Sequence, residues 1–335
     1  MEIPLRTKLL FWFIIGIFSV FFAEIISGSG PFSFITLEGW LFIFTLYTLH
    51  CLVLITIIYK KGKPTLPVLF FAGMLFGLYE AYITKILWNP DWNLEAIRLG
   101  GVAVFTTITL ILFWHVFFSF IIPIFIVENM FTKSSNILNL LPYKFKKLFI
   151  NSKKYKILLL LFFISIGIII GGQIQNPISV LISIISSILL FFITRFLWIR
   201  KIRDYKFEEL LPNKKEFIFL CVLLILYYVM TFKGFRYEYL PNLQSQASIW
   251  LIYTITIIFF IKALNKSKKI QPTNDIILIN YSNKRFLFYL TLFLIIGICS
   301  SLIAIYTSII AIVLIWGLGG IFGIWLLISS IKKTL

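Results

Sequence analysis

The chain has 335 residues, of which 60% are hydrophobic and only 13% are charged. A soluble domain usually carries about 25% charged residues, so a soluble fold of this length would lack the polar surface that keeps it in solution. The apolar residues form long continuous runs of about 20 residues, which is the length of a helix that crosses a bilayer. Barrel strands would instead alternate over segments of about ten residues. We therefore expect an all-α, polytopic membrane helix bundle.

The formal net charge of +18 is unusually basic. The basic residues lie between the apolar runs, where they orient the chain and contact anionic lipid headgroups at the cytoplasmic loops, so we expect no nucleic-acid partner. The two histidines and three cysteines are scattered, so we expect no metal site and no cofactor. The oligomeric state is left open.

The apolar runs predict ten membrane-spanning helices. We place them at about residues 8–27, 39–59, 65–88, 102–128, 156–172, 178–198, 216–232, 248–264, 286–305 and 309–330. Two stretches without charge, of 38 residues after Lys156 and 46 residues after Arg285, are each too long for one crossing. With both termini on the cytoplasmic side, 27 of the 31 basic residues face the cytoplasm and 4 face outward. This asymmetry favours the N-in, C-in topology.

The polar residues inside the membrane are concentrated in the first four spans. We therefore divide the chain into a polar N-terminal four-helix unit (1–131), a cytoplasmic amphipathic basic loop (132–155) and a C-terminal six-helix unit (156–335). Within the loop, residues 139–150 mix apolar and lysine side chains at helical spacing and predict one interfacial helix. A similar segment, 204–215, shares its Leu-Leu-Pro sequence.

Glu80 is the sharpest candidate for a functional group, because an ionisable residue inside a membrane is costly to bury. Gly73 and Gly77 precede it on nearly the same helix face, and such a Gly-x-x-x-Gly face favours close packing of a neighbouring helix. Glu80 would then point into the bundle. It would act as a proton carrier, an acid/base group or a ligand anchor, or it would only hold two helices together.

His115 lies near the middle of the fourth span and shares a face with Ser119 four residues later. Pro123 frees backbone groups near Ser119. If the third and fourth spans are antiparallel neighbours, Glu80 and His115 come close enough for a hydrogen bond, and we expect them to line one cavity with Glu24 at its outer mouth. His50 is interpreted as a neutral histidine hydrogen-bonded to a neighbouring helix, and Lys85 is expected to extend outward to the membrane surface.

These residues resemble a family of prokaryotic multi-pass membrane proteins without an assigned function, over about residues 20–130. The resemblance implies the cell membrane of a prokaryote as the location. It rests on four groups of residues: Phe22-Ala23-Glu24 with Ser27-Gly28-Ser29 and Pro31; Phe76-Gly77 with Glu80; Asn89-Pro90-Asp91-Trp92; and His115 with Phe118-Ser119, Pro123 and Val127-Glu128. The chain departs from the family pattern at Tyr79, where a second Glu is expected, and at Trp114, where Tyr is expected.

A fainter similarity to CAAX-processing intramembrane proteases extends only to Glu80 and His115. The position of their arginine holds Thr84 or Lys85, and their third motif is missing, so we do not assign the chain to them. Three functions stay open. The chain is a transporter or binder of a small solute or lipid, an intramembrane enzyme (hydrolase or lipid-modifying) that uses Glu80 and His115, or a membrane scaffold.

Overall fold

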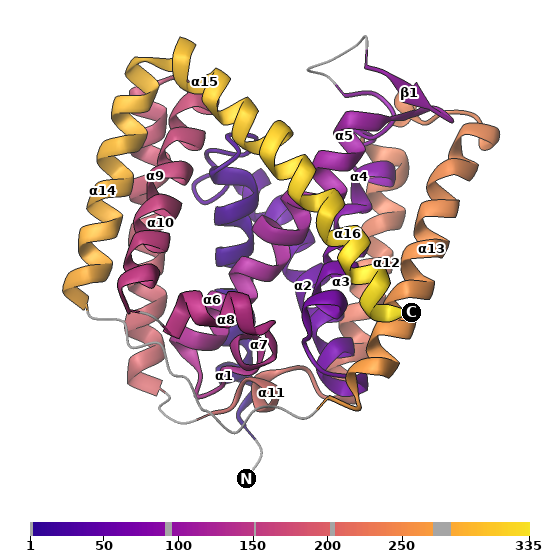
Figure 1. The fold of residues 1–335 in the computed structure, drawn as a ribbon, viewed down its shortest axis with the longest axis horizontal. Coiled ribbons are helices and arrows are strands. Elements are labelled where there is room, and N and C mark those ends of the chain that lie inside the picture. The colour runs from indigo at the N-terminus through magenta and orange to yellow at the C-terminus, as the bar shows by residue number, and fades with distance from the viewer. Residues whose placement is uncertain (1–2, 91–95, 151, 202–204, 271–282) are drawn as a thin grey trace. The chain divides into compact units, whose positions relative to one another are not determined.

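The computed structural model describes residues 3–90, 96–150, 152–201, 205–270 and 283–335 (Figure 1). Within these ranges eight helices are long and apolar enough to cross a membrane: Leu5–Ile25, Gly39–Lys61, Val104–Phe131, Lys153–Ile174, Pro177–Ile199, Lys214–Gly234, Leu243–Ser267 and Ala304–Thr334. Two shorter apolar helices, Leu66–Tyr82 and Leu287–Leu302, occupy the two remaining predicted positions. The chain is thus an all-α, multi-pass membrane protein, as predicted.

One compact unit, unit 1, comprises Met1–Thr48, Ile122–Leu211 and Pro272–Leu314. Its elements are α1 (Leu5–Val20), η1 (Phe21–Ile25), η2 (Gly39–Phe44), the first turn of α2 (Thr45–Lys61), α6 (Ile122–Phe131), α7 (Asn136–Leu140), α8 (Tyr143–Ile150), α9 (Ser152–Ile174), α10 (Pro177–Lys201), α11 (Phe207–Leu210), α14 (Asn283–Leu302) and α15 (Ala304–Ile312). Helix α9 packs against α14 closely, since a Cβ at Gly167 would lie 2.8 Å from Ile296. Unit 1 contains Glu24.

The second compact unit, unit 2, comprises Leu49–Ile121, Pro212–Gln271 and Ile315–Leu335. Its elements are most of α2, α3 (Leu66–Gly77), α4 (Tyr79–Tyr82), β1 (Arg98–Leu99), β2 (Val102–Ala103), α5 (Val104–Thr109), η3 (Leu110–Ile121), α12 (Lys214–Gly234), η4 (Tyr237–Tyr239), α13 (Leu243–Ser267), the end of η5 (Val313–Gly319) and α16 (Gly320–Thr334). Unit 2 contains Glu80 and His115. The predicted division at residues 131 and 155 concerned polar content, which this grouping does not test, so it stays a prediction.

A short hairpin at the start of the fourth span was not predicted. Strands β1 and β2 pair antiparallel, with Arg98 opposite Ala103 and Leu99 opposite Val102. Gly100 and Gly101 make the turn between them with φ of +57° and +81°. Two successive residues with positive φ are typical of a type I′ turn, which glycine adopts without steric cost. Asp91, Trp92 and Asn93, the centre of the predicted outer turn, lie outside the described residues.

Glycines determine how closely the helices of unit 2 pack around η3. A Cβ at Gly73 of α3 would lie 2.7 Å from the Val116 Cα, and a Cβ at Gly77 would lie 2.9 Å from the His115 Cβ. On α16, a Cβ at Gly323 would lie 2.8 Å from the Leu112 carbonyl oxygen. The predicted close packing on the Gly73–Gly77 face is therefore confirmed, and η3 is its partner.

Helix η3 winds as a π-helix over Leu110–Ile121. A π-helix of this length is rare, and π-helical segments are frequent at functional sites. Near its end, Pro123 has no N–H to donate to the Ser119 carbonyl. The Cys51 thiol donates to that carbonyl instead, with an Sγ–O distance of 3.5 Å. This contact meets the expectation that Pro123 frees backbone groups near Ser119.

The predicted single helix over residues 139–150 is wrong. Helix α7 ends at Leu140, and α8 begins at Tyr143. Between them Leu141 is extended, with φ −64° and ψ 146°, because the ring of Pro142 excludes the helical conformation of the preceding residue. The second Leu-Leu-Pro segment behaves alike, since α11 ends at Leu210 and Leu211 is extended at ψ 157°.

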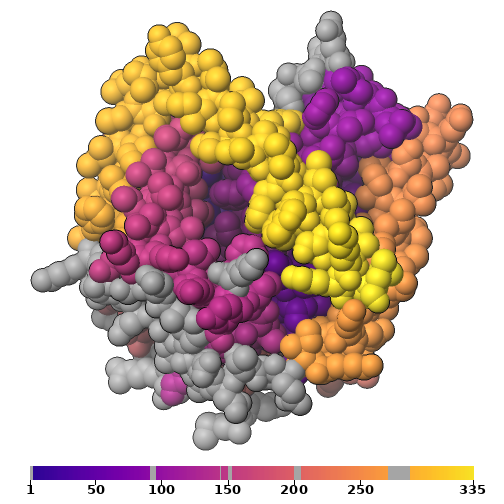
Figure 2. All heavy atoms as spheres, in the orientation of Figure 1, coloured from indigo at the N-terminus to yellow at the C-terminus, as the bar shows by residue number. Residues whose placement is uncertain are grey.

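The spans differ in how deeply they are buried. In the three long spans that carry Glu24, His50 and His115, 61–78% of the apolar stretch is buried, against 11–33% in the other five. Helix α16, which forms part of the face shown in Figure 2, exposes Ile321 and Trp325 by 67% and 50%. The spans with polar residues thus lie in the protein interior, while the others present apolar side chains to lipid.

The N-in, C-in topology stays a prediction that chemical labelling checks. In a background whose native cysteines are replaced by alanine, we expect a membrane-impermeant maleimide to label Leu99→Cys on intact cells and not Lys147→Cys. Both side chains are exposed in the structure, so burial does not explain a difference between them. Permeabilised cells should show labelling of both variants. Labelling of Lys147→Cys alone on intact cells would contradict the topology.

We expect Gly77→Ala to lower the free energy of unfolding by about 1–3 kcal/mol, because its methyl group overlaps His115. The matched control is Gly317→Ala, also in a membrane helix, where no atom lies within 4 Å of the added Cβ. The control should leave stability unchanged or raise it by up to about 1 kcal/mol. Unfolding in mixed micelles, followed by circular dichroism, measures both. Equal stabilities of the two variants would reject the packing argument.

Candidate functional site

The centre of the candidate site is Glu80, one turn beyond the glycine face of α3. Helix α3 ends at Gly77, and Glu80 lies in the short following helix α4. Its side chain is 5% exposed. Because Gly77 allows α3 to approach η3 to within van der Waals contact, the Glu80 carboxyl reaches the His115 imidazole. Local sequence thus places this acid against η3.

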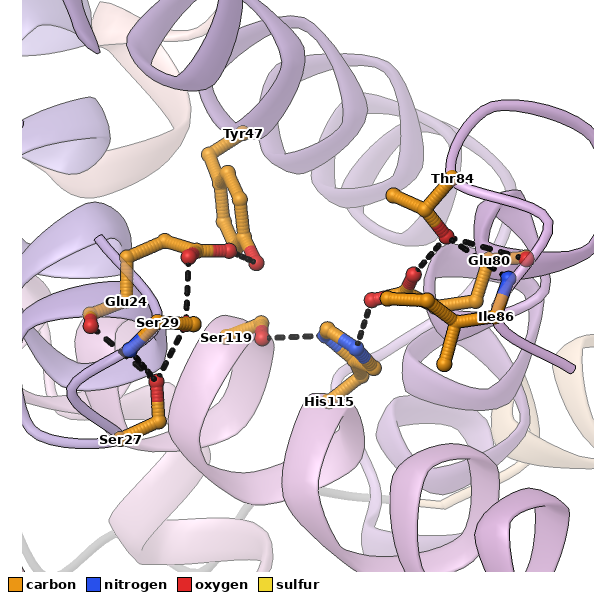
Figure 3. A network of polar contacts seen from close by, with 9 residues as sticks. All are labelled: Glu24, Ser27, Ser29, Tyr47, Glu80, Thr84, Ile86, His115 and Ser119. Carbon is orange, nitrogen blue, oxygen red and sulfur yellow. Dashed lines mark hydrogen bonds and ion pairs between the residues drawn. The ribbon is translucent and has the colours of Figure 1, made fainter. Parts of the chain in front are cut away.

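His115 joins Glu80 to Ser119 in a hydrogen-bonded chain (Figure 3). The His115 Nε2 lies 2.8 Å from the Glu80 Oε1, and the Nδ1 lies 2.7 Å from the Ser119 Oγ. His115 and Ser119 are 2% and 0% exposed. The predicted proximity of Glu80 and His115 is confirmed, as is the shared face of His115 and Ser119.

One proton lies in each of the two bonds. A neutral imidazole donates through one nitrogen and accepts through the other, whereas a hydroxyl does either. A His115 that donates to a carboxylate can therefore accept from Ser119, and a His115 that accepts from a protonated Glu80 can donate to Ser119. The chain accommodates both proton positions without breaking a hydrogen bond.

Thr84 completes the surroundings of Glu80. Its Oγ1 contacts the Glu80 Oε2 and also donates to the Glu80 backbone carbonyl, at 3.1 Å (Figure 3). Both carboxyl oxygens thus have hydrogen-bond partners. A buried carboxyl is tolerated only when it is paired or hydrogen-bonded, and Glu80 meets that condition.

Two aromatic rings cover the Glu80–His115 pair and bring in the second histidine of the chain. The Tyr79 ring meets the His115 ring edge-on at 5.1 Å and lies 5.8 Å from the His50 ring. Phe76 stacks on His50 at 5.1 Å. The His50 Nε2 lies 2.9 Å from the Tyr228 hydroxyl. His50 is therefore hydrogen-bonded to another helix, α12, as predicted.

Lys85 does not extend outward, so that prediction was wrong. Its side chain is fully buried, and its Nζ donates to the carbonyls of Thr231 at 3.2 Å and Phe232 at 3.0 Å, and to that of Phe235. These carbonyls lie in the last turn and at the C-cap of α12, and that of Thr231 also accepts from the Phe235 N–H at 3.2 Å. The negative end of the helix dipole attracts the ammonium group, which ties the segment after Glu80 to α12.

Glu24 lies in unit 1 with partners of its own. The Tyr47 hydroxyl donates to Oε1, and the Ser29 hydroxyl donates to Oε2 at 2.6 Å (Figure 3). The Ser27 Oγ lies 2.6 Å from the Ser29 Oγ and donates to the Glu24 carbonyl at 3.1 Å. The expectation that Glu24 shares a cavity with Glu80 and His115 stays a prediction.

The chemistry that this arrangement supports is the binding and release of protons. Carboxyl, imidazole and hydroxyl groups in a row are the components of proton relays inside membranes. Within the described ranges, no three His, Cys, Asp or Glu side chains are grouped to hold a metal ion. Glu80, His115 and Ser119 thus offer a proton-binding centre and hydrogen bonds to a polar ligand.

Sequence reasoning missed Tyr228 and the place of Tyr79 between the two histidines. A signal for part of this set was present, because Tyr227 and Tyr228 are adjacent in an apolar span. A tyrosine hydroxyl usually finds a hydrogen-bond partner when it is buried, so a mid-membrane tyrosine predicts a polar partner on another helix. Which helix supplies that partner is a matter of tertiary packing.

Comparisons with known proteins give a family without an activity. The profile of a family described as an uncharacterized membrane protein family matches residues 13–334. A protein of Archaeoglobus fulgidus described as an uncharacterized protein is 31% identical over 293 residues, which cover 86% of this chain and 88% of that protein. No solved structure matches.

A double-mutant cycle measures the interaction between Glu80 and His115. We expect Glu80→Gln and His115→Gln each to lower the free energy of unfolding, and the double variant to lose less than the combined losses, with an interaction energy of about 0.5–3 kcal/mol. The physical reason is that the second substitution removes a bond that the first has already broken. As a control, the cycle of Glu80→Gln with Glu216→Gln should be additive. Additivity in both cycles would mean that Glu80 and His115 do not interact.

Proposed function

Given that the chain belongs to this family of membrane proteins, we propose that it binds or transports a small solute or lipid, with the Glu80–His115–Ser119 chain as its polar centre. The observation that carries the proposal is the continuous run of carboxyl, imidazole and hydroxyl groups, joined at 2.7 and 2.8 Å among buried apolar side chains. Such a run exchanges a proton with a bound ligand or with water.

The energetic balance favours a functional role for Glu80 over a purely structural role in holding two helices together. An acidic side chain at mid-membrane costs on the order of 2.5–3.5 kcal/mol on insertion scales. A hydrogen bond between membrane helices contributes about 0.6 kcal/mol on average. At that average, the bonds to His115 and Thr84 together do not offset the cost of placing Glu80 in the interior. The glycine contacts already hold α3 against η3 without it.

The surroundings that we propose are a prokaryotic cell membrane with anionic lipid headgroups at the cytoplasmic face. Support comes from the 27 basic residues assigned to the cytoplasmic side. Helix α8 carries some of them, and its Lys147 is exposed. Basic side chains beside partly buried apolar ones are suited to a helix lying at the headgroup level.

A ligand and lipid screen by thermal shift tests the proposal. The purified protein is screened in detergent against small solutes and lipids, alongside Glu80→Gln and the matched control Glu216→Gln. A ligand at one hundred times its Kd stabilises the native state by about 2.7 kcal/mol. We expect at least one ligand to stabilise the wild type and Glu216→Gln to that extent, and Glu80→Gln by much less.

Ligands that stabilise all three proteins alike would bind elsewhere and would reject Glu80 as part of the binding site. A screen in which nothing stabilises the wild type would reject binding of the tested classes and favour the scaffold.

A second candidate is an intramembrane hydrolase, favoured by the order of the three groups. A hydroxyl hydrogen-bonded to an imidazole, itself bonded to a carboxyl, is the arrangement that activates a serine nucleophile. A fluorophosphonate probe should then label the wild type and Ser29→Ala, but not Ser119→Ala or His115→Gln. An unlabelled wild type, or a labelled Ser119→Ala, would reject this candidate. The full burial of Ser119 ranks it second.

A further inference from the structure

His50, the other histidine of the protein, belongs to another polar cluster of unit 2. His50 is 4% exposed, and its Nε2 lies 2.9 Å from the Tyr228 hydroxyl. Tyr253 lies near Tyr228, and its hydroxyl donates to the Leu78 carbonyl at 2.8 Å. The cluster therefore links α2, α12, α13 and the end of α3. It is a buried acid–base cluster that lies outside the Glu80–His115–Ser119 series of hydrogen bonds.

The two clusters share a wall of two rings. Tyr79 lies 5.8 Å from the His50 ring and 5.1 Å from the His115 ring, so the two imidazoles are at most about 11 Å apart. Phe76 contacts both imidazoles as well, at 5.1 and 6.0 Å. Tyr79 and Phe76 are 1% and 0% exposed, so dissolved salt screens the interaction across them only weakly.

The ionisable groups of the His50 cluster and its surroundings come from several elements. They are Cys51 from α2 itself, Tyr79, Glu80 and Tyr82 from α4, His115 from η3, Tyr227 and Tyr228 from α12 and Tyr253 from α13, with the Lys85 ammonium at the end of α12. Glu80 acts electrostatically on the Tyr228 hydroxyl. Glu80 is also the bonding partner of His115, so it influences both histidines.

We propose that His50 and Tyr228 form a second proton-binding site, and that its occupancy is coupled to that of the Glu80–His115 pair across the Tyr79–Phe76 wall. The ligand of this site is a proton, which binds to an imidazole nitrogen of His50 and leaves to water or to the pair. Two unit charges about 11 Å apart at an effective dielectric constant of about 20 alter each other's titration by about one pH unit. The proposal does not depend on whether the protein carries a solute.

The chain offers a direct experiment because it has only two histidines. Protein labelled with ¹⁵N-histidine gives two imidazole spin systems, which His50→Gln and His115→Gln assign. We expect His115→Gln to move the midpoint of the His50 titration by up to about one pH unit, and Glu80→Gln to move it as well. The matched control Glu216→Gln, twelve residues before Tyr228 on α12 and so about 18 Å away along the helix, should leave it in place.

Two further variants test the same proposal independently. Tyr228→Phe removes the hydroxyl bonded to His50 and should alter the His50 Nε2 chemical shift. Each protonated imidazole repels the other, so removing one histidine should move the titration of the other, with the larger shift on the histidine that titrates at lower pH. A His50 Nε2 shift unchanged in Tyr228→Phe would overturn the site. If neither histidine changes its titration midpoint when the other histidine or Glu80 is substituted, the coupling is overturned.

Discussion

The close approach of α3 to η3 is the constraint on which the rest of unit 2 depends. Gly73 and Gly77 present no side chain, so the two helices touch along their backbones and Glu80 reaches His115 at 2.8 Å. Any side chain at Gly77 would first meet the Cβ of His115. In a membrane, where lipid is as apolar as the helices, such packing is a main source of helix association. The same contact thus stabilises the bundle and forms the site.

Segments far apart in the chain then complete the site around that contact. Tyr228 of α12 bonds to His50, and three residues later the end of the same helix receives the Lys85 ammonium group. Tyr253 of α13 donates to the Leu78 carbonyl beside Glu80. The bonds of Lys85 and Leu78 join the segment around Glu80 to helices more than 140 residues away. A shift of α12 would therefore displace the segment around Glu80 without any change in α3 or η3.

The sequence allowed prediction of whatever follows from helical period and depth, and no more. The ten apolar helices follow from the lengths of the apolar runs. The Gly73–Gly77 face and the Glu80–His115 bond follow from residue spacing along two consecutive spans. Lys85 was misjudged, and the partner of His50 was not identified, because Tyr228 and the last carbonyls of α12 lie on a helix that periodicity cannot place beside them. The break at Pro142 was within reach of local reasoning, since proline restricts the residue before it.

The most direct measurement of the central claim is the Glu80–His115 interaction energy with and without the glycine contact. The double-mutant cycle is repeated in a Gly77→Ala background and, as control, in a Gly317→Ala background, by unfolding in mixed micelles. If glycine packing positions the pair, the interaction energy falls well below its wild-type value in Gly77→Ala and is retained in Gly317→Ala. An interaction energy that survives Gly77→Ala undiminished would show that the pair forms without the close approach of α3 and η3, and would contradict this account.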